Sequence, residues 1–371
     1  MTLSRSLLSS LFVNAEQSKS ISLAQWELIL LIFRDSQVLA KYCYFLKSKD
    51  AFNPLPTYVK RHLENAEVIA NKQQKQIEYE ALELLKVTSF SSKYSIFLKG
   101  AAYSLADNEA GKGRIYSDID LIVTKSSIKS IESNLSTLGW LAKEMDEYDQ
   151  NYYREWAHEI PPMMHANRGT VLDLHHNLVP PMSGRADNLS AIIESTVTVS
   201  KNIKVLSPPA MALHSAIHLF FNEEFHNGFR DIHDLHLLFT EHNDDEFWQQ
   251  ILTLAKSSGF EIELFLAIRF SHQLFQTQVP THVNQALDFY NHCWKLRYWD
   301  FLFSRVLCPH HPYLKVPYKK TAIFLALARG HLLKMPLPML IKHSTHKMWQ
   351  GLVKAIFGQA FYKTETNQRK P

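Results

Sequence analysis

The segment Ser117-Asp118-Ile119-Asp120-Leu121-Ile122-Val123 decides the fold. Its polar and apolar residues alternate, which predicts a β-strand. Side chains two positions apart point to the same face of a strand, so Asp118 and Asp120 are expected to project together. Two neighbouring carboxylates repel each other and are costly to desolvate, and a hard cation such as Mg²⁺ resolves that conflict. Because Asp-x-Asp spacing is common, a solvated strand end with two surface acids is the alternative for this segment taken alone.

Two flanking segments favour a site over a solvated strand end. Upstream, Gly100 follows a short apolar run and precedes a helix-compatible stretch, 101–105. A backbone without side-chain bulk can approach phosphate oxygens at such a point. Downstream, the segment 172–175 predicts a second strand, with Asp173 between apolar neighbours. Three carboxylates from two strands suit a two-metal site for phosphoryl or nucleotidyl transfer. In such a site two of the acids bind both ions, and the third completes the coordination of the ion that activates the attacking hydroxyl.

These residues and several further ones resemble a known family. The matching pieces are Phe97–Ala102, Gly113-Arg114, Ser117–Val123, Leu138–Trp140 and Val171–His176. They are similar to the uncharacterised bacterial nucleotidyltransferase family of the polymerase-β-like superfamily. The resemblance implies an α+β fold, in which a small mixed-sheet nucleotidyltransferase core is flanked by N-terminal and C-terminal helical regions. It covers most of the chain, but only residues 100–123 and 172–175 are specific.

The resemblance also implies an activity and a set of site residues. A Mg²⁺-dependent enzyme with a two-ion site would move a nucleoside monophosphate from an NTP to an acceptor hydroxyl. The expected catalytic and metal-binding residues are Asp118, Asp120 and Asp173, and Asp173 would help to activate the acceptor. The expected nucleotide-binding residues are Lys99, Gly100, Ala101, Arg114 and Ser117. A small molecule or sugar is the favoured acceptor, while an RNA 3′ end and a protein hydroxyl stay open.

Two departures from the superfamily pattern favour a second reading. Ser or Gly usually follows the glycine and holds the β- and γ-phosphates, whereas Ala101 stands here and keeps only the amide. The spacing to Asp118 is also longer, which leaves room for the loop 107–114. Both departures weaken the expected grip on a triphosphate. The alternative is therefore a catalytically inactive nucleotide-sensing or partner-binding module on the same fold.

The composition of the 371-residue chain fits a helix-rich globular protein. Apolar residues make up 46% and charged residues 20%, which is ordinary for a soluble domain, and only 11 glycines argue against a sandwich or barrel. Apolar residues recur at helical spacing through the first ninety residues. We expect an N-terminal helical region (1–90), a nucleotidyltransferase core (91–205), a helical domain (206–310) and a basic helical C-terminal segment (311–371).

Cysteines and hydropathy bear on the cellular compartment. The three cysteines lie far apart and lack CxxC spacing, so neither a disulfide framework nor a thiolate zinc site is expected and a reducing cytoplasm fits best. No apolar run reaches the roughly 18 residues that would span a bilayer. The serine-interrupted apolar residues 7–13 predict an amphipathic helix rather than a signal peptide.

The charge is unevenly distributed along the chain. From His311 onward eleven Lys or Arg stand against the single acid Glu365, a segment charge of +10, which leaves −6 for the remainder of a chain whose formal total is +4. A basic segment on an acidic body indicates an anionic partner, either nucleic acid or a membrane surface to which the protein would bind peripherally. A solvated basic tail without a dedicated partner is the alternative.

Several histidines and one ion pair are weaker candidates. His214 and His218 have the spacing of a helical metal pair, but no Glu lies between them as in a zinc hydrolase motif, so packed histidines are favoured. His175 alternates onto the face of its strand that carries the acid, where it could contact the acceptor or the metal shell. Arg230 and Asp234 have the spacing of a helical ion pair, with Arg230 reaching the nucleotide as the alternative.

Overall fold

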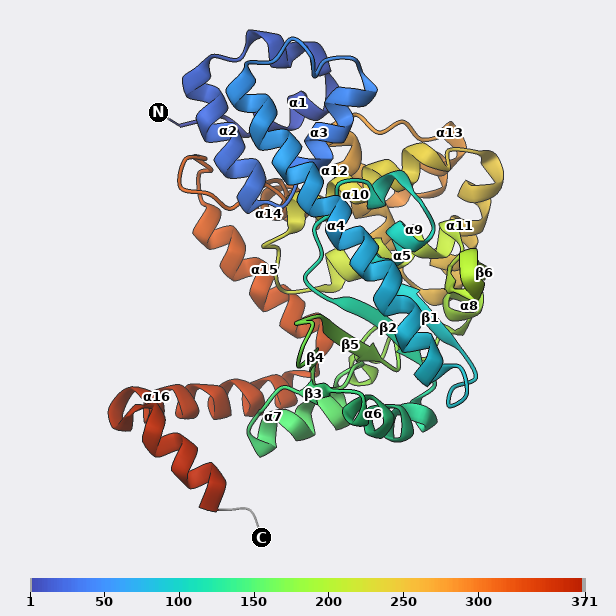
Figure 1. The fold of residues 1–371 in the computed structure, drawn as a ribbon, viewed down its shortest axis with the longest axis vertical. Helices are drawn as coiled ribbons and strands as arrows, with labels where there is room; N and C mark the ends of the chain where they lie inside the picture. Colours follow the sequence, from blue (N-terminus) through green and yellow to red (C-terminus); the bar gives the residue numbers. More distant parts are fainter. Residues whose placement is uncertain (1, 369–371) are drawn as a thin grey trace.

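The core of the protein, seen in a computed structural model that describes residues 2–368, is a seven-stranded mixed sheet. Its strands lie in the order β3-β4-β5-β2-β1-β7-β6 (Figure 1). Their bounds are β1 (Ser95–Leu98), β2 (Ile119–Val123), β3 (Trp140–Ala142), β4 (Met163–His165), β5 (Val171–His175), β6 (Thr196–Thr198) and β7 (Lys204–Leu206). With helices before, between and after the strands, the expected α+β class is confirmed.

The central strands bring the acid-bearing segments together. β2 pairs antiparallel with β1, with Leu98 opposite Asp120. On its other side β2 pairs parallel with β5, with Asp120 opposite Asp173. All five residues of β2 are buried, and its four apolar residues anchor the strand between layers of helices. The predicted convergence of the two acidic strands is therefore present in the sheet.

β2 begins two residues later than the alternating pattern predicted. Ser117 and Asp118 precede the strand, which starts at Ile119. The reason lies in the neighbouring strand β1, which ends at Leu98, the partner of Asp120. Lys99 then turns away from the sheet with φ of +49°, so no ladder partner exists on that side for Ser117 and Asp118.

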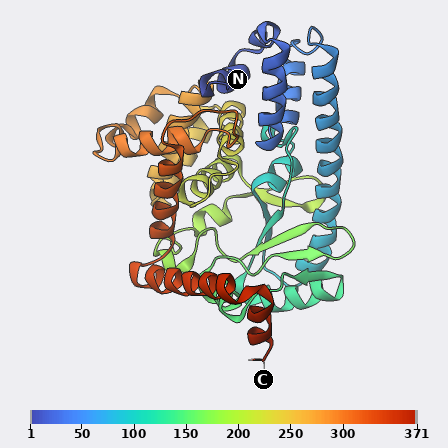
Figure 2. The ribbon, with the colours of Figure 1, turned by 90° about the vertical axis from the view of Figure 1, so that its left-hand side faces the viewer.

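Helices before the sheet form one layer of the molecule (Figure 1, Figure 2). They are α1 (Arg5–Val13), α2 (Leu23–Asp35), α3 (Leu39–Ser48) and α4 (Thr57–Thr88), with a 3₁₀ turn at Ala15–Ser20. The amphipathic helix expected at 7–13 is thus present as part of α1. The long helix α4 runs from the N-terminal helices down to the sheet, where Glu80 accepts two hydrogen bonds from Arg168, at 2.6 and 2.9 Å.

Shorter helices connect the strands. They are α5 (Lys99–Leu105), α6 (Ile128–Thr137), α7 (Glu147–Asn151) and α8 (Ser190–Glu194), with a π turn at Tyr152–Trp156 and 3₁₀ turns at Glu109–Gly111, Lys125–Ser127, Pro181–Ser183 and Ser200–Asn202. α6 ends just before Gly139, whose φ of +89° suits the left-handed position that commonly follows a helix.

Helices after the sheet cover its other side and extend into the C-terminal segment. They are α9 (Pro208–Phe221), α10 (Gly228–Glu241), α11 (Asp245–Ser258), α12 (Glu261–Phe275), α13 (Thr281–Ala286), α14 (Leu296–Val306), α15 (Lys319–Lys334) and α16 (Leu337–Gln368), with a 3₁₀ turn at Asp288–His292. The almost wholly buried α9 packs against β7 and α5 and is the centre of this layer. Among the aromatic residues near α14, Trp299 and Phe303 are in the core, whereas Trp294 is 84% exposed.

The hydropathy of the described helices agrees with the prediction from sequence. Within residues 2–368, no helix combines the length and the apolar character that crossing a bilayer requires.

Candidate active site

The site begins where β1 passes into α5. Leu98 ends the strand in an extended conformation, and the next residue, Lys99, adopts the left-handed conformation that side chains other than glycine rarely take. This turn directs the ammonium group of Lys99 back toward β2, where its Nζ lies 2.6 Å from Oδ1 of Asp120. The strained backbone of Lys99 thus accompanies the contact of its ammonium group with Asp120.

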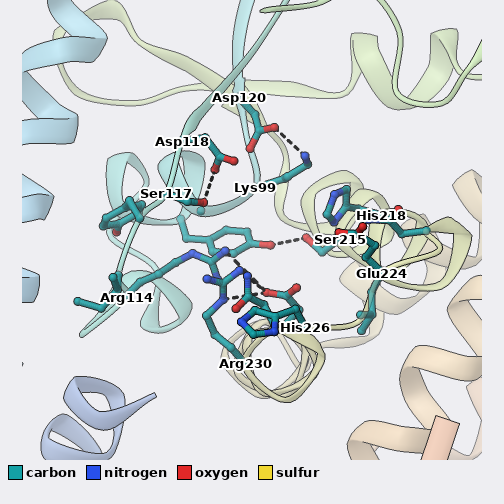
Figure 3. A pocket seen from close by; sticks show the side chains of 18 residues that line it. Lys99, Arg114, Ser117, Asp118, Asp120, Ser215, His218, Glu224, His226 and Arg230 are labelled. Carbon is teal, nitrogen blue, oxygen red and sulfur yellow. Dashed lines mark hydrogen bonds and ion pairs between the residues drawn. The ribbon is translucent and has the colours of Figure 1, made fainter. Parts of the chain in front are cut away.

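The three predicted carboxylates come from adjacent backbone positions. Asp120 is opposite Asp173 in the parallel pair. Asp118 lies two residues before Asp120, and Figure 3 shows the side chains of these two acids close to each other. Residues that lie opposite each other in a parallel strand pair point to the same face of the sheet. Asp118, two positions before Asp120, is expected on that face as well. Ser117 Oγ donates a hydrogen bond of 3.0 Å to Asp118.

Asp120 is the best-neutralised of these acids. Burial by itself would raise its pKa, but the ammonium of Lys99 and the hydrogen-bonded ring of His175 outweigh burial and hold the pKa below its usual range. His175 Nε2 donates to Oδ1 of Asp120 over 2.9 Å. Burial alone would lower the pKa of Lys99. The carboxylates of Asp120 and Glu159 outweigh burial, so the pKa of Lys99 is raised. Asp120 is therefore ionised, with its charge already compensated.

Asp173 has the opposite electrostatic environment. Burial first, and then the nearby carboxylates of Asp120, Glu159 and Asp118, raise its pKa to about 7, against the smaller lowering effect of His175. Its Oδ1 is buried and makes no hydrogen bond to any residue that the structure describes. The pKa of Asp118 is also raised, by burial first and by Asp120 second. The site thus holds more negative charge than its own cations neutralise.

This donor set fits a hard divalent cation. Carboxylate oxygens are the ligands that Mg²⁺ prefers, and a cation would compensate the charge that raises the pKa values of Asp118 and Asp173. The buried, unpaired Oδ1 of Asp173 is the kind of atom that a ligand or ion satisfies. Asp118, Asp120 and Asp173 are the residues that could hold such an ion.

A cavity of about 280 Å³ opens beside two of the acids (Figure 3). One wall comes from the β1–α5 turn and the segment before β2, and the opposite wall from α9, α10 and the loop between them. The polar residues that line it are Lys99, Tyr103, Arg114, Tyr116, Ser117, Asp118, Asp120, Ser215, His218, Asn222, Glu224, His226, Asn227, Arg230 and Asp231. Asp118 and Asp120 lie at one side of this cavity, and Asp173 is not among its lining residues. The cavity can therefore place a ligand next to the acids.

Gly100 and Arg114 lie against each other in the cavity wall. A Cβ atom at position 100 would collide with the guanidinium group of Arg114. Arg114 in turn forms an ion pair with Asp234 of α10, which also pairs with Lys41 of α3 at 2.8 Å. The absence of a side chain at Gly100 therefore lets another group come close to the backbone. In this structure that group is the guanidinium of Arg114, which pairs with the buried Asp234.

The other residues predicted to bind the nucleotide lie in different environments. Ser117 lines the cavity and contacts Asp118, whereas Ala101 is buried within α5 and is not among the lining residues. The predicted helical pair of Arg230 with Asp234 is wrong. Arg230 pairs with Asp231 at 2.9 Å, because the carboxylate of Asp234 is taken by cations from elements distant in sequence.

The paired histidines of α9 are packed, as expected. Burial is the first cause that lowers the pKa of His214, to about 3, and it also lowers the pKa of His218. His218 nevertheless lines the cavity. Neutral imidazoles at this wall can donate or accept hydrogen bonds without adding charge.

Sequence reasoning missed two residues beside the acids. His158 and Glu159 precede β4, and Glu159 Oε2 lies 3.3 Å from Nδ1 of His175. One potential ligand atom from each of His158, Glu159 and His175 lies within 4.8 Å of the other two. The segment 151–160 carries no periodic pattern, so only the His-Glu dipeptide hinted at a role.

A family model described as "Uncharacterised nucleotidyltransferase" matches residues 22–276. Among solved structures, the chain is similar to a STING-associated CdnE c-di-GMP synthase from Capnocytophaga granulosa, with 12% identity and a TM-score of 0.27, over 82% of this chain and 96% of that one. Comparison with curated proteins gives no match.

Proposed function

Because the chain belongs to this uncharacterised nucleotidyltransferase family, we propose that it uses Mg²⁺ to transfer a nucleoside monophosphate from an NTP to an acceptor hydroxyl. The observation that carries the proposal is the pairing of Asp120 with Asp173 across two parallel strands, with Asp118 beside them. The charges of Asp118 and Asp173 are only partly compensated in the folded protein, which is costly, and a cation-dependent reaction would account for keeping them.

In this proposal the acids divide the work. Asp118 and Asp120 hold the ions, which would stabilise charge on the reacting phosphate and leaving group. Asp173, opposite Asp120 in the strand pair, would complete the coordination of the ion that activates the acceptor hydroxyl. The carboxylate of Asp120 stays ionised throughout, because Lys99 and His175 keep its pKa low.

Basic and polar side chains of the cavity would orient the nucleotide. Lys99 lies closest to the acids, and its ammonium is positioned to bind a phosphate oxygen when a cation takes its place at Asp120. Arg114 supplies positive potential from the cavity wall, although Asp234 already holds its guanidinium. Catalysis would then consist mainly of positioning and charge neutralisation.

The acceptor is proposed as a small molecule or sugar, with RNA 3′ ends and protein hydroxyls as the other candidates. The full-length chain is incubated with Mg²⁺, α-phosphate-labelled NTPs and each acceptor class, and pyrophosphate release is followed with label transfer. Activity that disappears in Asp120→Asn and persists in the exposed control Asp187→Asn supports the proposal. Equal activity in both variants would refute the role of Asp120.

The inactive-module alternative makes a different prediction for the same samples. It rests on Ala101, which supplies no hydroxyl after Gly100. Calorimetric binding of Mg²⁺-NTP without turnover on any acceptor class would favour it, whereas turnover with any acceptor excludes it.

A further inference from the structure

The helix α16 meets the rest of the protein with its polar side. Lys347 forms an ion pair with Asp149 of α7, and Gln350 donates to Asp146 over 3.2 Å. The ring of His346 stacks on Tyr148 with 3.9 Å between centroids. The contacts that hold this part of α16 in place are therefore ion pairs, hydrogen bonds and ring stacking.

The opposite side of α16 is apolar and faces solvent. Beside the exposed Trp349, five exposed apolar residues spaced by four or seven positions form one stripe along the helix: Leu337, Ile341, Met348, Leu352 and Ile356. These five side chains are between 52% and 73% exposed. Single exposed apolar residues are ordinary, but a continuous row on one helical face marks a surface that is buried against something else.

Another surface helix of the same chain shows the usual arrangement. In α11 the apolar residues Phe247, Trp248 and Ile251 are buried, while its exposed face is polar and charged. α16 reverses this pattern. α16 is not a short connecting helix. It spans 32 residues and projects along the edge of the molecule (Figure 1, Figure 2).

Charge decides which partner fits the apolar stripe. Residues from 311 onward carry eleven Lys or Arg and one Glu, while the rest of the chain is net negative. Among them, Lys320 of α15 and Lys342 beside the stripe are exposed. A second copy pairing α16 with α16 would bring two strongly basic segments together, and a nucleic acid would leave the apolar stripe in water.

We propose that α16 docks on an anionic membrane surface, with its apolar stripe in the headgroup region and exposed basic residues such as Lys320 and Lys342 against lipid phosphates. Both features match a helix that lies in the plane of a membrane, which combines an apolar face with lysine and arginine. Each basic residue near such a surface adds attraction to anionic lipid, so binding depends on lipid charge and on salt.

The docking helix is tied to the wall of the cavity. In α15, which joins it to the body, Lys334 donates to Asn222 over 2.8 Å and Arg329 donates to the carbonyl of Phe220 over 2.6 Å. Asn222 lines the cavity. Membrane docking would therefore hold the cavity in a defined orientation to the surface, whatever reaction the site performs.

The test uses the full chain with vesicles of phosphatidylcholine, with and without phosphatidylglycerol. We expect partitioning at least about tenfold stronger onto the anionic vesicles, and a further weakening with salt. Met348→Glu with Leu352→Glu places two charges in the stripe and should weaken partitioning by about 10- to 100-fold. The matched control, Val68→Glu with Ile69→Glu, changes two exposed apolar residues of α4 and should bind as the wild type does.

Circular dichroism of all variants checks that the fold is retained. Absence of preference for anionic vesicles would overturn the proposal, as would equal loss of binding in the α4 control. Concentration-dependent dimerisation that the α16 variant abolishes, without vesicle binding, would assign the stripe to a second copy instead. Salt-sensitive binding of single-stranded RNA without vesicle binding would assign the segment to nucleic acid and refute the membrane as its partner.

Discussion

Asp120 in β2 and Asp173 in β5 lie directly opposite each other in a parallel strand pair, yet their carboxyl groups have opposite pKa shifts. Lys99 and His175 contact Asp120 and keep its charge. Asp173 has no such cation and retains an unpaired buried oxygen. In the metal-free protein Asp120 therefore stays ionised, whereas the charge of Asp173 depends on pH.

The first prediction concerns the pH dependence of stability in metal-free protein. The folded pKa of Asp173, about 7, exceeds the unfolded value of about 3.9. Between these values the folded state binds the proton more strongly, so the free energy of unfolding decreases as pH rises from about 4 to about 7. Asp173→Asn removes this decrease and should be more stable than the wild type at pH 8 by on the order of 2–4 kcal/mol.

Urea unfolding in EDTA at pH 4.5 and pH 8 measures the effect. The control Asp187→Asn changes an exposed aspartate away from the site, and its stability at pH 8 should show no comparable gain. A stability difference between Asp173→Asn and wild type that is the same at both pH values would contradict the raised pKa.

The second prediction concerns Lys99, whose ammonium competes with a cation for Asp120. Lys99→Met should tighten Mn²⁺ binding to the nucleotide-free protein and weaken NTP binding, each by about fivefold to tenfold, because one positive charge is lost from the site. Isothermal titration calorimetry measures both. Lys112→Met removes an exposed lysine that pairs with Glu109, and should change neither affinity. Weakening of both affinities in Lys99→Met would indicate collapse of the site rather than competition.

The third prediction follows from the contact of Gly100 with Arg114. Gly100→Ala forces the guanidinium away from its place beside Asp234 and should cost about 1–3 kcal/mol of stability, as overpacking does elsewhere. Gly351→Ala is the matched control, because a Cβ at that exposed helical position meets open space and should stabilise slightly. Thermal or urea unfolding distinguishes them, and equal stabilities would show that Arg114 moves freely.

The fourth prediction concerns the buried charges around Asp234. Asp234→Asn leaves Lys41 and Arg114 without the acid between them and should cost about 3–5 kcal/mol. Asp300→Asn breaks the more exposed pair with Arg269 and should cost about 1 kcal/mol or less. Urea unfolding of both variants gives the comparison, and a loss at Asp234 no greater than at Asp300 would contradict a structural role for the cluster.

Local patterns made the acid-bearing strands predictable from sequence. Alternation in residues 117–123 and 171–175 places the acids, and a one-residue slip would have turned their apolar neighbours to solvent. The start of β2 at Ile119 was not predictable, because it depends on where β1 ends and on the left-handed backbone of Lys99.

Contacts between distant segments account for most of what the sequence could not show. The Lys41–Asp234–Arg114 cluster joins α3, α10 and the loop before β2, and none of these partners is local in sequence. Lys41 within an apolar helix was the only sign of it. The outward apolar face of α16 likewise depends on which side of the helix meets α7, which the residue spacing does not reveal.

The central claim is that Asp118, Asp120 and Asp173 together hold the ions at which the nucleotide reacts. The most direct measurement is electron paramagnetic resonance of Mn²⁺ bound to the full chain with a non-hydrolysable NTP. We predict two bound ions per chain with the spin coupling expected at about 3.5–4 Å separation. Asp120→Asn should abolish that coupling, and Asp187→Asn should leave it unchanged. Undiminished coupling and stoichiometry in Asp120→Asn would contradict the account.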